Sequence, residues 1–271
     1  MIKQAIIPLA GLGTRLLPLT SVFAKELLPI NGKPGLEYII EECIEAGIKE
    51  IVFIISKKKL MIKKYFYNDK FYKDIIKKKN DPKIIKEYKK ILKYKKMIKF
   101  VFQDKPLGTG DAVYKTKKFI TDKYFLMLLP DDLIIKKNCS KSMIAVHNKF
   151  KASVMASMKV NKSDVSRWGI YNIKKKIDKN NFIINNVVEK PSIKTSPSNN
   201  AVIGRYILPK KIFSKLKSLK PGKSGEFHIT DAIQALIEDD NQFIGHNFSG
   251  KYLDCGTMKG YIKSTLEISK Q

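Results

Sequence analysis

A glycine-rich loop at the end of the first apolar segment is the first feature that could do chemistry. The run Ala10–Arg15, which reads AGLGTR, follows directly on the apolar stretch Gln4–Leu9. Glycines at a strand end let the backbone approach a phosphate closely and point its N–H groups at the anion. The loop lacks the third glycine of the dinucleotide fingerprint and the terminal Gly-Lys-Ser/Thr of a P-loop. Arg15 offers a planar fork suited to a triphosphate, although a tight structural turn would explain the glycines alone.

Two adjacent carboxylates follow another apolar segment. Asp131 and Asp132 come after Tyr124–Leu129, which predicts a buried strand. Ligands of open α/β sheets lie at the carboxyl edge of the strands, and hard carboxylate oxygens suit Mg²⁺. An Asp-rich turn at a strand end is the structural alternative.

A side-chain amide and an adjacent acid–base pair could recognise the organic parts of a substrate. Gln103 can offer a donor and an acceptor to a pyrimidine edge, and Gly108 leaves room for the base. Glu189 could accept hydrogen bonds from sugar hydroxyls, while Lys190 beside it offers a cation to a phosphate. A surface Glu-Lys-Pro turn is the alternative explanation of this pair. Lys25, in a loop rich in proline and small residues, is a candidate flexible cation that closes over phosphates.

The elements that must position these residues alternate between strand and helix. This order predicts βαβ units and a largely parallel sheet, in one domain over residues 1–271. Further strands are expected at Ile51–Ile55, Ile98–Phe102, Ala152–Val160, Phe182–Val188 and Ala201–Leu208. Helices are expected at Lys33–Gly47, Asp111–Phe119, Pro209–Leu219, Thr230–Asp239 and Thr257–Ser269.

A lysine-rich segment separates two of the expected strands. Lys57–Lys99 contains eighteen lysines, and aromatic residues are interleaved with them. The apolar spacing predicts one or two helices, inserted at about 57–97. The segment could bind RNA, but a solvated helical excursion or an oligomer contact is the favoured interpretation.

The composition bounds the class of protein. Lys and Arg total 53 against 25 Asp and Glu, a formal charge of +28. Such a charge is compatible with a nucleic-acid or anionic-membrane binder, but a coding bias explains an excess that is spread everywhere. Arginine, which nucleic-acid binders favour, occurs only at Arg15, Arg167 and Arg205. No apolar run approaches the roughly 18 residues that span a bilayer, and three scattered cysteines favour reduced thiols. We therefore expect a cytoplasmic protein without a nucleic-acid or membrane partner.

Taken together, these motifs resemble a known family. The runs GLGTRLLPLT and KELLPINGKP are similar to the signature of the sugar-phosphate nucleotidylyltransferases, and the similarity continues along nearly the whole chain. Ala10 before the glycines and Lys25-Glu26 resemble the bacterial UTP–glucose-1-phosphate uridylyltransferases more than the thymidylyltransferases. The resemblance implies a Rossmann-like three-layer α/β fold with a mixed, mostly parallel sheet. It also implies Mg²⁺-dependent transfer of a uridylyl group from UTP to glucose 1-phosphate, by a homodimer or homotetramer.

The resemblance also implies roles for individual residues. The nucleotide would be bound by Ala10, Gly11, Gly13, Glu26, Gln103 and Gly108. The sugar phosphate would be bound by Gly169, Glu189, Lys190 and Gly204, with the Val202–Tyr206 segment lining the sugar pocket. The catalytic groups would be Arg15, Lys25, Asp131 and Lys190. Asp131 would hold the metal with Asp254, for which capping of the last helix is the alternative.

One segment departs from the family pattern. The family usually has Gly-Leu-Gly-His-Ala-Val where this chain has Gly-Thr-Gly-Asp-Ala-Val. Thr109 resembles the acetylglucosamine-1-phosphate uridylyltransferases, and Asp111 reads as a helix N-cap. The alternatives are therefore the same chemistry with dTTP and glucose 1-phosphate, or with UTP and acetylglucosamine 1-phosphate. A more distant one is a non-catalytic nucleic-acid-binding protein. The histidines form no triad, so no covalent nucleophile is expected.

Overall fold

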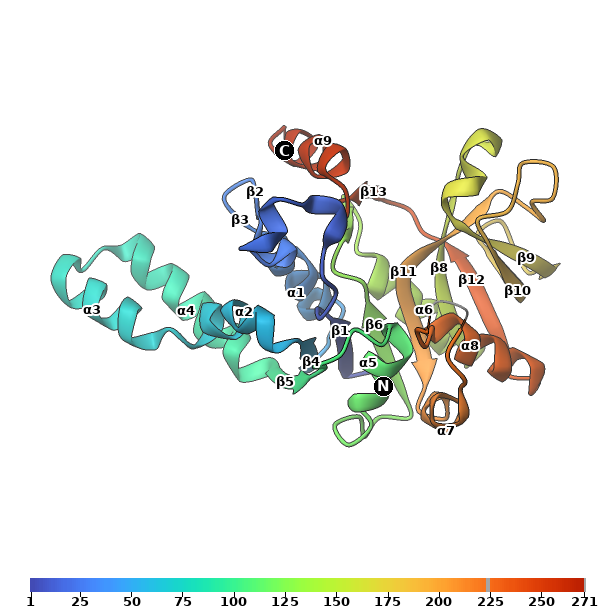
Figure 1. The fold of residues 1–271 in the computed structure, drawn as a ribbon, viewed down its shortest axis with the longest axis horizontal. Helices are drawn as coiled ribbons and strands as arrows, with labels where there is room; N and C mark the ends of the chain where they lie inside the picture. The colour runs from blue at the N-terminus through green and yellow to red at the C-terminus, as the bar shows by residue number, and fades with distance from the viewer. Residues whose placement is uncertain (223–224, 271) are drawn as a thin grey trace.

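A nine-stranded mixed sheet runs through the protein, with helices on both of its faces (Figure 1). The computed structural model describes residues 1–222 and 225–270. The order of strands across the sheet is β5-β4-β1-β6-β11-β8-β12-β10-β9. Their bounds are β1 (Gln4–Pro8), β4 (Glu50–Ile55), β5 (Ile98–Phe102), β6 (Tyr124–Leu128), β8 (Ser153–Lys159), β9 (Gly169–Lys176), β10 (Asn181–Glu189), β11 (Asn200–Pro209) and β12 (Phe243–Asn247).

Most strands of this sheet point the same way. Strand β1 is parallel to β4 and β6, β4 is parallel to β5, and β8 is parallel to β12. Only β10 and β11 are antiparallel to the strands on either side of them. Parallel neighbours need long crossovers, which here carry helices. The predicted mixed, mostly parallel sheet of a Rossmann-like fold is confirmed.

The sheet separates two hydrophobic cores. Side chains alternate along β1, so that Ile7 packs into one core and Ile6 into the other. The helices of the first core include α1 (Gly35–Glu45), α6 (Cys139–Phe150) and α9 (Met258–Ile268), and those of the second are α5 (Thr109–Lys115), α7 (Ile212–Ser218) and α8 (Ile229–Glu238). None of the helices in the described residues is long and apolar enough to cross a bilayer.

Two small sheets complete the carboxyl edge of the main one. They pair β2 (Pro29–Ile30) with β3 (Lys33–Pro34), and β7 (Asp132–Ile135) with β13 (Lys251–Asp254). The second pair sets Asp132 opposite Asp254, so a distant C-terminal segment reaches the carboxylates. The sequence analysis missed these strands, β9, β12 and helix α6. Short strands and the half-exposed, lysine-bearing β9 have little apolar alternation to reveal them.

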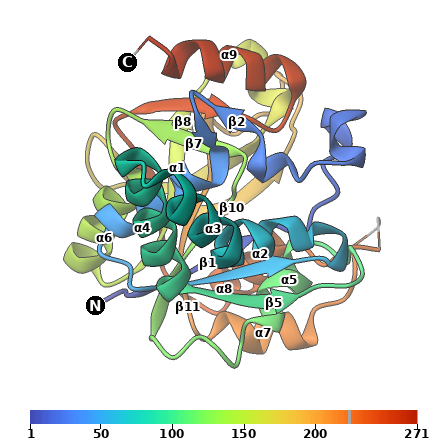
Figure 2. The same ribbon diagram turned by 90° about the vertical axis from the view of Figure 1, so that its left-hand side faces the viewer.

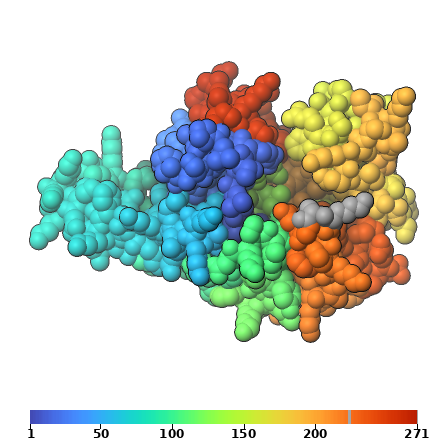
Figure 3. All heavy atoms as spheres, in the orientation of Figure 1, coloured from blue at the N-terminus to red at the C-terminus, as the bar shows by residue number. Residues whose placement is uncertain are grey.

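The lysine-rich segment forms an arm of three helices, not the expected one or two. They are α2 (Leu60–Tyr67), α3 (Asp69–Lys79) and α4 (Pro82–Met97). Asn80 at φ +45°, the N-cap Asp81 and Pro82 at the first helical turn separate α3 from α4. The arm projects from the rest of the molecule (Figures 1 and 3), and α3 faces the viewer in Figure 2. Its base is anchored by buried Ile62 and Phe66.

Candidate active site

A cavity of about 500 Å³ opens where β1 ends. Eight of the residues expected to bind the nucleotide or to act on it contribute to its wall. They are Ala10, Gly11, Gly13, Lys25, Glu26, Gln103, Gly108 and Asp131. Glu226 and His228, which precede α8, also line it and were not predicted. The chain folds these two against the cavity from a segment that lies 95 residues or more from the other lining residues.

The glycine-rich loop forms one wall of this cavity. Gly13 has φ +70°, a left-handed conformation that side chains rarely adopt, and its carbonyl accepts a hydrogen bond from Thr20 Oγ1 at 2.8 Å. A side chain at Gly11 would meet no other atom within 4 Å, so the loop leaves open space there. Arg15 is 66% exposed, and its terminal nitrogen lies 3.6 Å from Asp131 Oδ2. The loop therefore combines free room with a cation, as a phosphate requires.

Lys25 and Asp131 form an ion pair on the floor of the site. Lys25 Nζ lies 2.7 Å from Asp131 Oδ2, and both side chains are largely buried. Burial opposes both charges, but the attraction outweighs it, so the pKa of Asp131 is lowered and that of Lys25 is raised. Lys25 begins a 3-10 turn, Lys25–Leu27. It is thus held on Asp131, whereas the sequence suggested a flexible cation.

Asp132 connects this floor to the rest of the fold. Its Oδ2 accepts a hydrogen bond from the Gly204 backbone at 2.8 Å, and its Oδ1 accepts one from Tyr252 Oη at 2.7 Å. Burial and the charge of Asp131 raise the pKa of Asp132 to about 6. The Tyr252 ring in turn contacts Trp168 edge-on, with 5.4 Å between ring centroids. Asp132 therefore orients the segment Leu129–Asp132, the carboxylate segment, against the strands of the expected sugar side.

Gly204 is where this packing is tightest. A Cβ added there would lie 2.5 Å from both Asp132 Oδ2 and Leu129 Cβ. We expect Gly204→Ala to push the carboxylate segment away and to lower the free energy of unfolding by about 1–3 kcal/mol, with loss of activity. Urea denaturation measures the first effect. Gly11→Ala, whose Cβ meets no atom within 4 Å, is the matched control for stability; equal unfolding midpoints for the two variants would contradict this account.

The two carboxylates assigned to a metal both lie close to Gly256. A Cβ built on Gly256 would be 2.9 Å from Asp131 Oδ2 and 3.2 Å from Asp254 Oδ1. Two carboxylates joined by substrate phosphates are the usual protein environment of Mg²⁺. Among residues 1–222 and 225–270 no cluster of three or more His, Cys, Asp or Glu could hold a metal by itself. The residues thus fit a metal that is shared with a substrate. Thr257, and not Asp254, is the N-cap of α9.

Glu26 lines the cavity, but its carboxylate is engaged elsewhere. Both of its oxygens lie 2.8 Å from Lys59 Nζ, in a buried ion pair. Burial lowers the pKa of Lys59, and the charge of Glu26 opposes this effect. Lys59 stands just before the lysine-rich arm, so this pair ties the base of the arm to the nucleotide wall. The sequence analysis missed Lys59 because nothing distinguishes it among its neighbouring lysines.

Gln103 and the divergent segment after it meet behind the cavity wall. Gln103 Nε2 donates hydrogen bonds to Asp111 Oδ2 at 2.8 Å and to Gly108 O at 3.0 Å. The N-cap of α5 is Gly108, so the interpretation of Asp111 as a helix cap is wrong. Thr109 Oγ1 accepts a hydrogen bond from Ile229 N at 3.2 Å and thereby satisfies the start of α8.

The residues expected to bind the sugar phosphate lie outside this cavity. Glu189 and Gly169 are paired across β10 and β9, and Lys190 follows at the end of β10. The side chains of Glu189 and Lys190 are 70% and 64% exposed, with 3.8 Å between their charged atoms. Gly204 packs against Asp132, as described above. The expected sugar side therefore presents an exposed acid–base pair, and only Gly204 touches the carboxylate segment.

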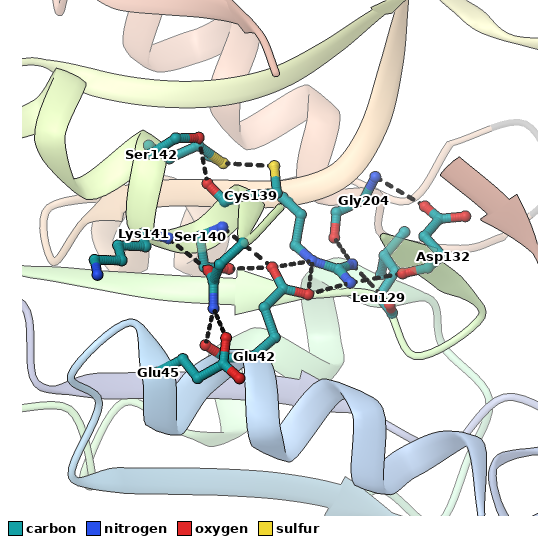
Figure 4. Close-up of polar contacts among 12 residues, drawn as sticks. Glu42, Glu45, Leu129, Asp132, Cys139, Ser140, Lys141, Ser142 and Gly204 are labelled. Atoms are coloured by element: carbon teal, nitrogen blue, oxygen red, sulfur yellow. Dashed lines mark hydrogen bonds and ion pairs between the residues drawn. The ribbon is translucent and has the colours of Figure 1, made fainter. Parts of the chain in front are cut away.

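Arg205 does not line a sugar pocket, contrary to the sequence analysis. It is fully buried and forms an ion pair with Glu42 of α1, at 2.8 Å. Its other donors reach the carbonyl oxygens of Leu129, Gly204 and Asp132. Figure 4 shows Glu42 between α1 and the labelled Leu129, Asp132 and Gly204. By donating to Leu129 O and to Asp132 O, Arg205 holds both ends of the segment that carries Asp131.

Comparison with known proteins decides the family. A model described as "Nucleotidyl transferase" matches residues 4–271. The chain belongs to the nucleotidyl transferase family. Members of this family generally use a divalent metal ion. The nucleotidyl transferase fold and the family resemblance inferred from the glycine-rich loop are thereby confirmed.

Relatives and solved structures of nucleotidyl transferases match along the full chain. UTP–glucose-1-phosphate uridylyltransferase 2 of Staphylococcus saprophyticus is 37% identical over 269 residues, 99% of this chain and 92% of the relative. A UDP-glucose pyrophosphorylase complexed with UDP-glucose has 34% identity and a TM-score of 0.87, covering 100% and 99% of the two chains. A UTP-bound UGPase of Acinetobacter baumannii has 31% identity and a TM-score of 0.89, covering 99% and 93%.

Proposed function

We propose that this nucleotidyl transferase joins UTP to glucose 1-phosphate and releases UDP-glucose and pyrophosphate. The observation that carries the proposal is the single cavity that the glycine-rich loop, Lys25, Gln103 and Asp131 line together. It supplies the three kinds of contact that a nucleoside triphosphate needs, namely backbone N–H groups, cations and a base-reading amide. The full-length relatives named for this reaction support the choice of substrates.

The proposed chemistry is an in-line attack by a sugar-phosphate oxygen on the α-phosphorus of UTP. Both reactants are anions, so the protein must align them and offset their repulsion. Arg15 would hold the triphosphate, Lys25 would face the reacting phosphates beside Asp131, and Lys190 would bind the sugar phosphate. The attacking oxygen is already ionised near neutral pH, so no general base is required.

We propose Mg²⁺ as the divalent ion, held by Asp131 and Asp254. When bound, it neutralises the charge that develops on the phosphates. Its carboxylate partners are held in place by groups of this chain. Gly256 N donates to Asp254 at 2.8 Å, and Lys25 donates to Asp131 at 2.7 Å. Both carboxylates lie within 3.2 Å of a Cβ position at Gly256, so one ion beside this glycine could contact both.

A pyrophosphate-release assay over a matrix of substrates tests the proposal. UTP, dTTP and CTP are each combined with glucose 1-phosphate and with acetylglucosamine 1-phosphate. We expect UTP with glucose 1-phosphate to give the highest kcat/KM. A higher value for dTTP or for acetylglucosamine 1-phosphate would favour the neighbouring activities. Tight, salt-sensitive RNA binding without pyrophosphate release would favour a nucleic-acid-binding protein.

Glu189→Ala tests the proposed sugar side. Loss of a carboxylate that accepts sugar hydroxyls is expected to raise the KM for glucose 1-phosphate by about tenfold and to leave the KM for UTP nearly unchanged. Steady-state kinetics with each substrate varied in turn measures both constants. Glu87→Ala, at an exposed carboxylate on the arm, is the matched control. An equal rise in both KM values would argue against a role confined to the sugar.

We propose that residues 1–271 act as one nucleotidyltransferase domain with the arm as an insertion. The homodimer or homotetramer and the cytoplasmic location expected from the sequence stay predictions.

A further inference from the structure

We infer that Asp111 makes the base pocket selective for a pyrimidine that presents a ring N–H, because it fixes the side-chain amide of Gln103. The inference rests on the proposed uridylyl transfer and names the group that sets its base specificity. Asp111 is a positioning residue in this account, since it acts on the base through Gln103.

The direction of the Gln103 amide follows from the chemistry of its two neighbours. Asp111 Oδ2 and Gly108 O are both acceptors, at 2.8 and 3.0 Å from Nε2. They use both hydrogens of the amide nitrogen. If the amide turned over, Oε1 would face two oxygens and both hydrogen bonds would be lost. Gln103 is only 5% exposed, so water does not replace these partners easily.

Asp111 is itself held in place by two features of α5. It lies in the first turn of the helix, where the aligned peptide dipoles favour a negative charge. Its second oxygen lies 3.3 Å from Nζ of Lys115, one turn further along the same helix. The carboxylate therefore presents a fixed acceptor to Gln103.

With its nitrogen occupied, Gln103 offers the cavity an oxygen. Oε1 receives no hydrogen bond from the part of the chain that the structure describes, and Gln103 lines the cavity. Uracil and thymine carry an N–H at ring position 3, which can donate to this oxygen. Cytosine has a lone pair at the same ring position, so oxygen and nitrogen would repel each other there. The pocket is thus built to accept UTP and to reject CTP.

The test compares kcat/KM for UTP and for CTP in variants of Asp111. Asp111→Asn keeps the size but can also donate, and Asp111→Leu removes the acceptor, so either change takes away the fixed carboxylate acceptor and leaves only Gly108 O to hold the amide nitrogen. We expect the UTP:CTP ratio to fall by about tenfold or more in both variants, the range that one mispaired hydrogen bond covers. Lys118→Met, at an exposed lysine just after α5, is the matched control; its ratio should stay near that of the parent protein.

A second measurement uses the unchanged protein. UTP methylated at ring nitrogen 3 cannot donate to Gln103, and calorimetry should show binding at least about tenfold weaker than that of UTP. Active Asp111 variants with an unchanged UTP:CTP ratio, or equal binding of the methylated analogue, would overturn the inference. Failure of the parent protein to release pyrophosphate from UTP would instead overturn the proposed function. The two failures are therefore distinguishable.

Discussion

Asp131→Asn is expected to abolish nucleotidyl transfer, with kcat lowered about a thousandfold or more. Asp131 lies 2.7 Å from Lys25 and 3.6 Å from Arg15, and it shares the space beside Gly256 with Asp254. The amide has almost the same shape but carries no charge, so it neither balances the two cations nor offers a metal a charged ligand. Pyrophosphate release at saturating Mg²⁺, UTP and glucose 1-phosphate measures the effect.

The matched control for this variant is Asp74→Asn, at an exposed carboxylate on α3 of the arm. It should leave kcat unchanged. Thermal unfolding of both variants separates a catalytic effect from a folding defect. Near-normal turnover of folded Asp131→Asn with Mg²⁺ would refute the assignment of Asp131 to the metal.

Arg205→Met is expected to lower the free energy of unfolding by about 3–5 kcal/mol, because it leaves the Glu42 carboxylate buried without its partner. Arg205 also donates to the carbonyl groups of Leu129 and Asp132. The substitution removes these hydrogen bonds, which hold the segment that carries Asp131. We therefore expect activity to fall together with stability. Denaturation in urea, followed by circular dichroism, measures the change.

A matched surface pair makes the Arg205 experiment sharper. Arg167 lies 3.7 Å from Asp164, and both side chains are exposed. Arg167→Met should cost less than about 1 kcal/mol, since water screens the pair. Replacing Glu42 and Arg205 together by apolar residues should recover part of the loss, because no buried charge then stays unpaired. Equal destabilisation by Arg205→Met and Arg167→Met would show that burial does not decide the effect.

The nucleotide half of the site was predictable because its parts sit next to strands that are easy to recognise. The residues of the glycine-rich loop, Gln103 and Asp131 each follow an apolar run at the carboxyl end of a parallel strand. Parallel strands bring those ends to one edge of the sheet. Local sequence therefore implied a shared location for them without any knowledge of long-range contacts.

The partners of those residues were not predictable in the same way. Lys59 looks like its neighbouring lysines, and Arg205 belongs to a segment that resembles a sugar-pocket motif. The roles of both depend on burial beside one carboxylate, Glu26 for Lys59 and Glu42 for Arg205. Asp111 reads as a helix cap from its place in the chain, yet its side chain faces Gln103. The partner of a charged residue can be identified only from the folded structure, in which both side chains are buried away from water.

The sequence by itself determined the family, the mixed α/β fold and the set of groups that could handle a triphosphate. The family and the mixed sheet follow from the resemblance of the motifs to a known family, whereas the alternation of strands and helices follows from apolar periodicity, which acts over a few residues. Only the tertiary structure decided how the groups are held: Lys25 on Asp131, Arg205 beneath the carboxylate segment, and Asp111 behind the base-reading amide. Pairing of buried charges depends on distance and desolvation between segments far apart in the chain, and those quantities exist only in the folded molecule.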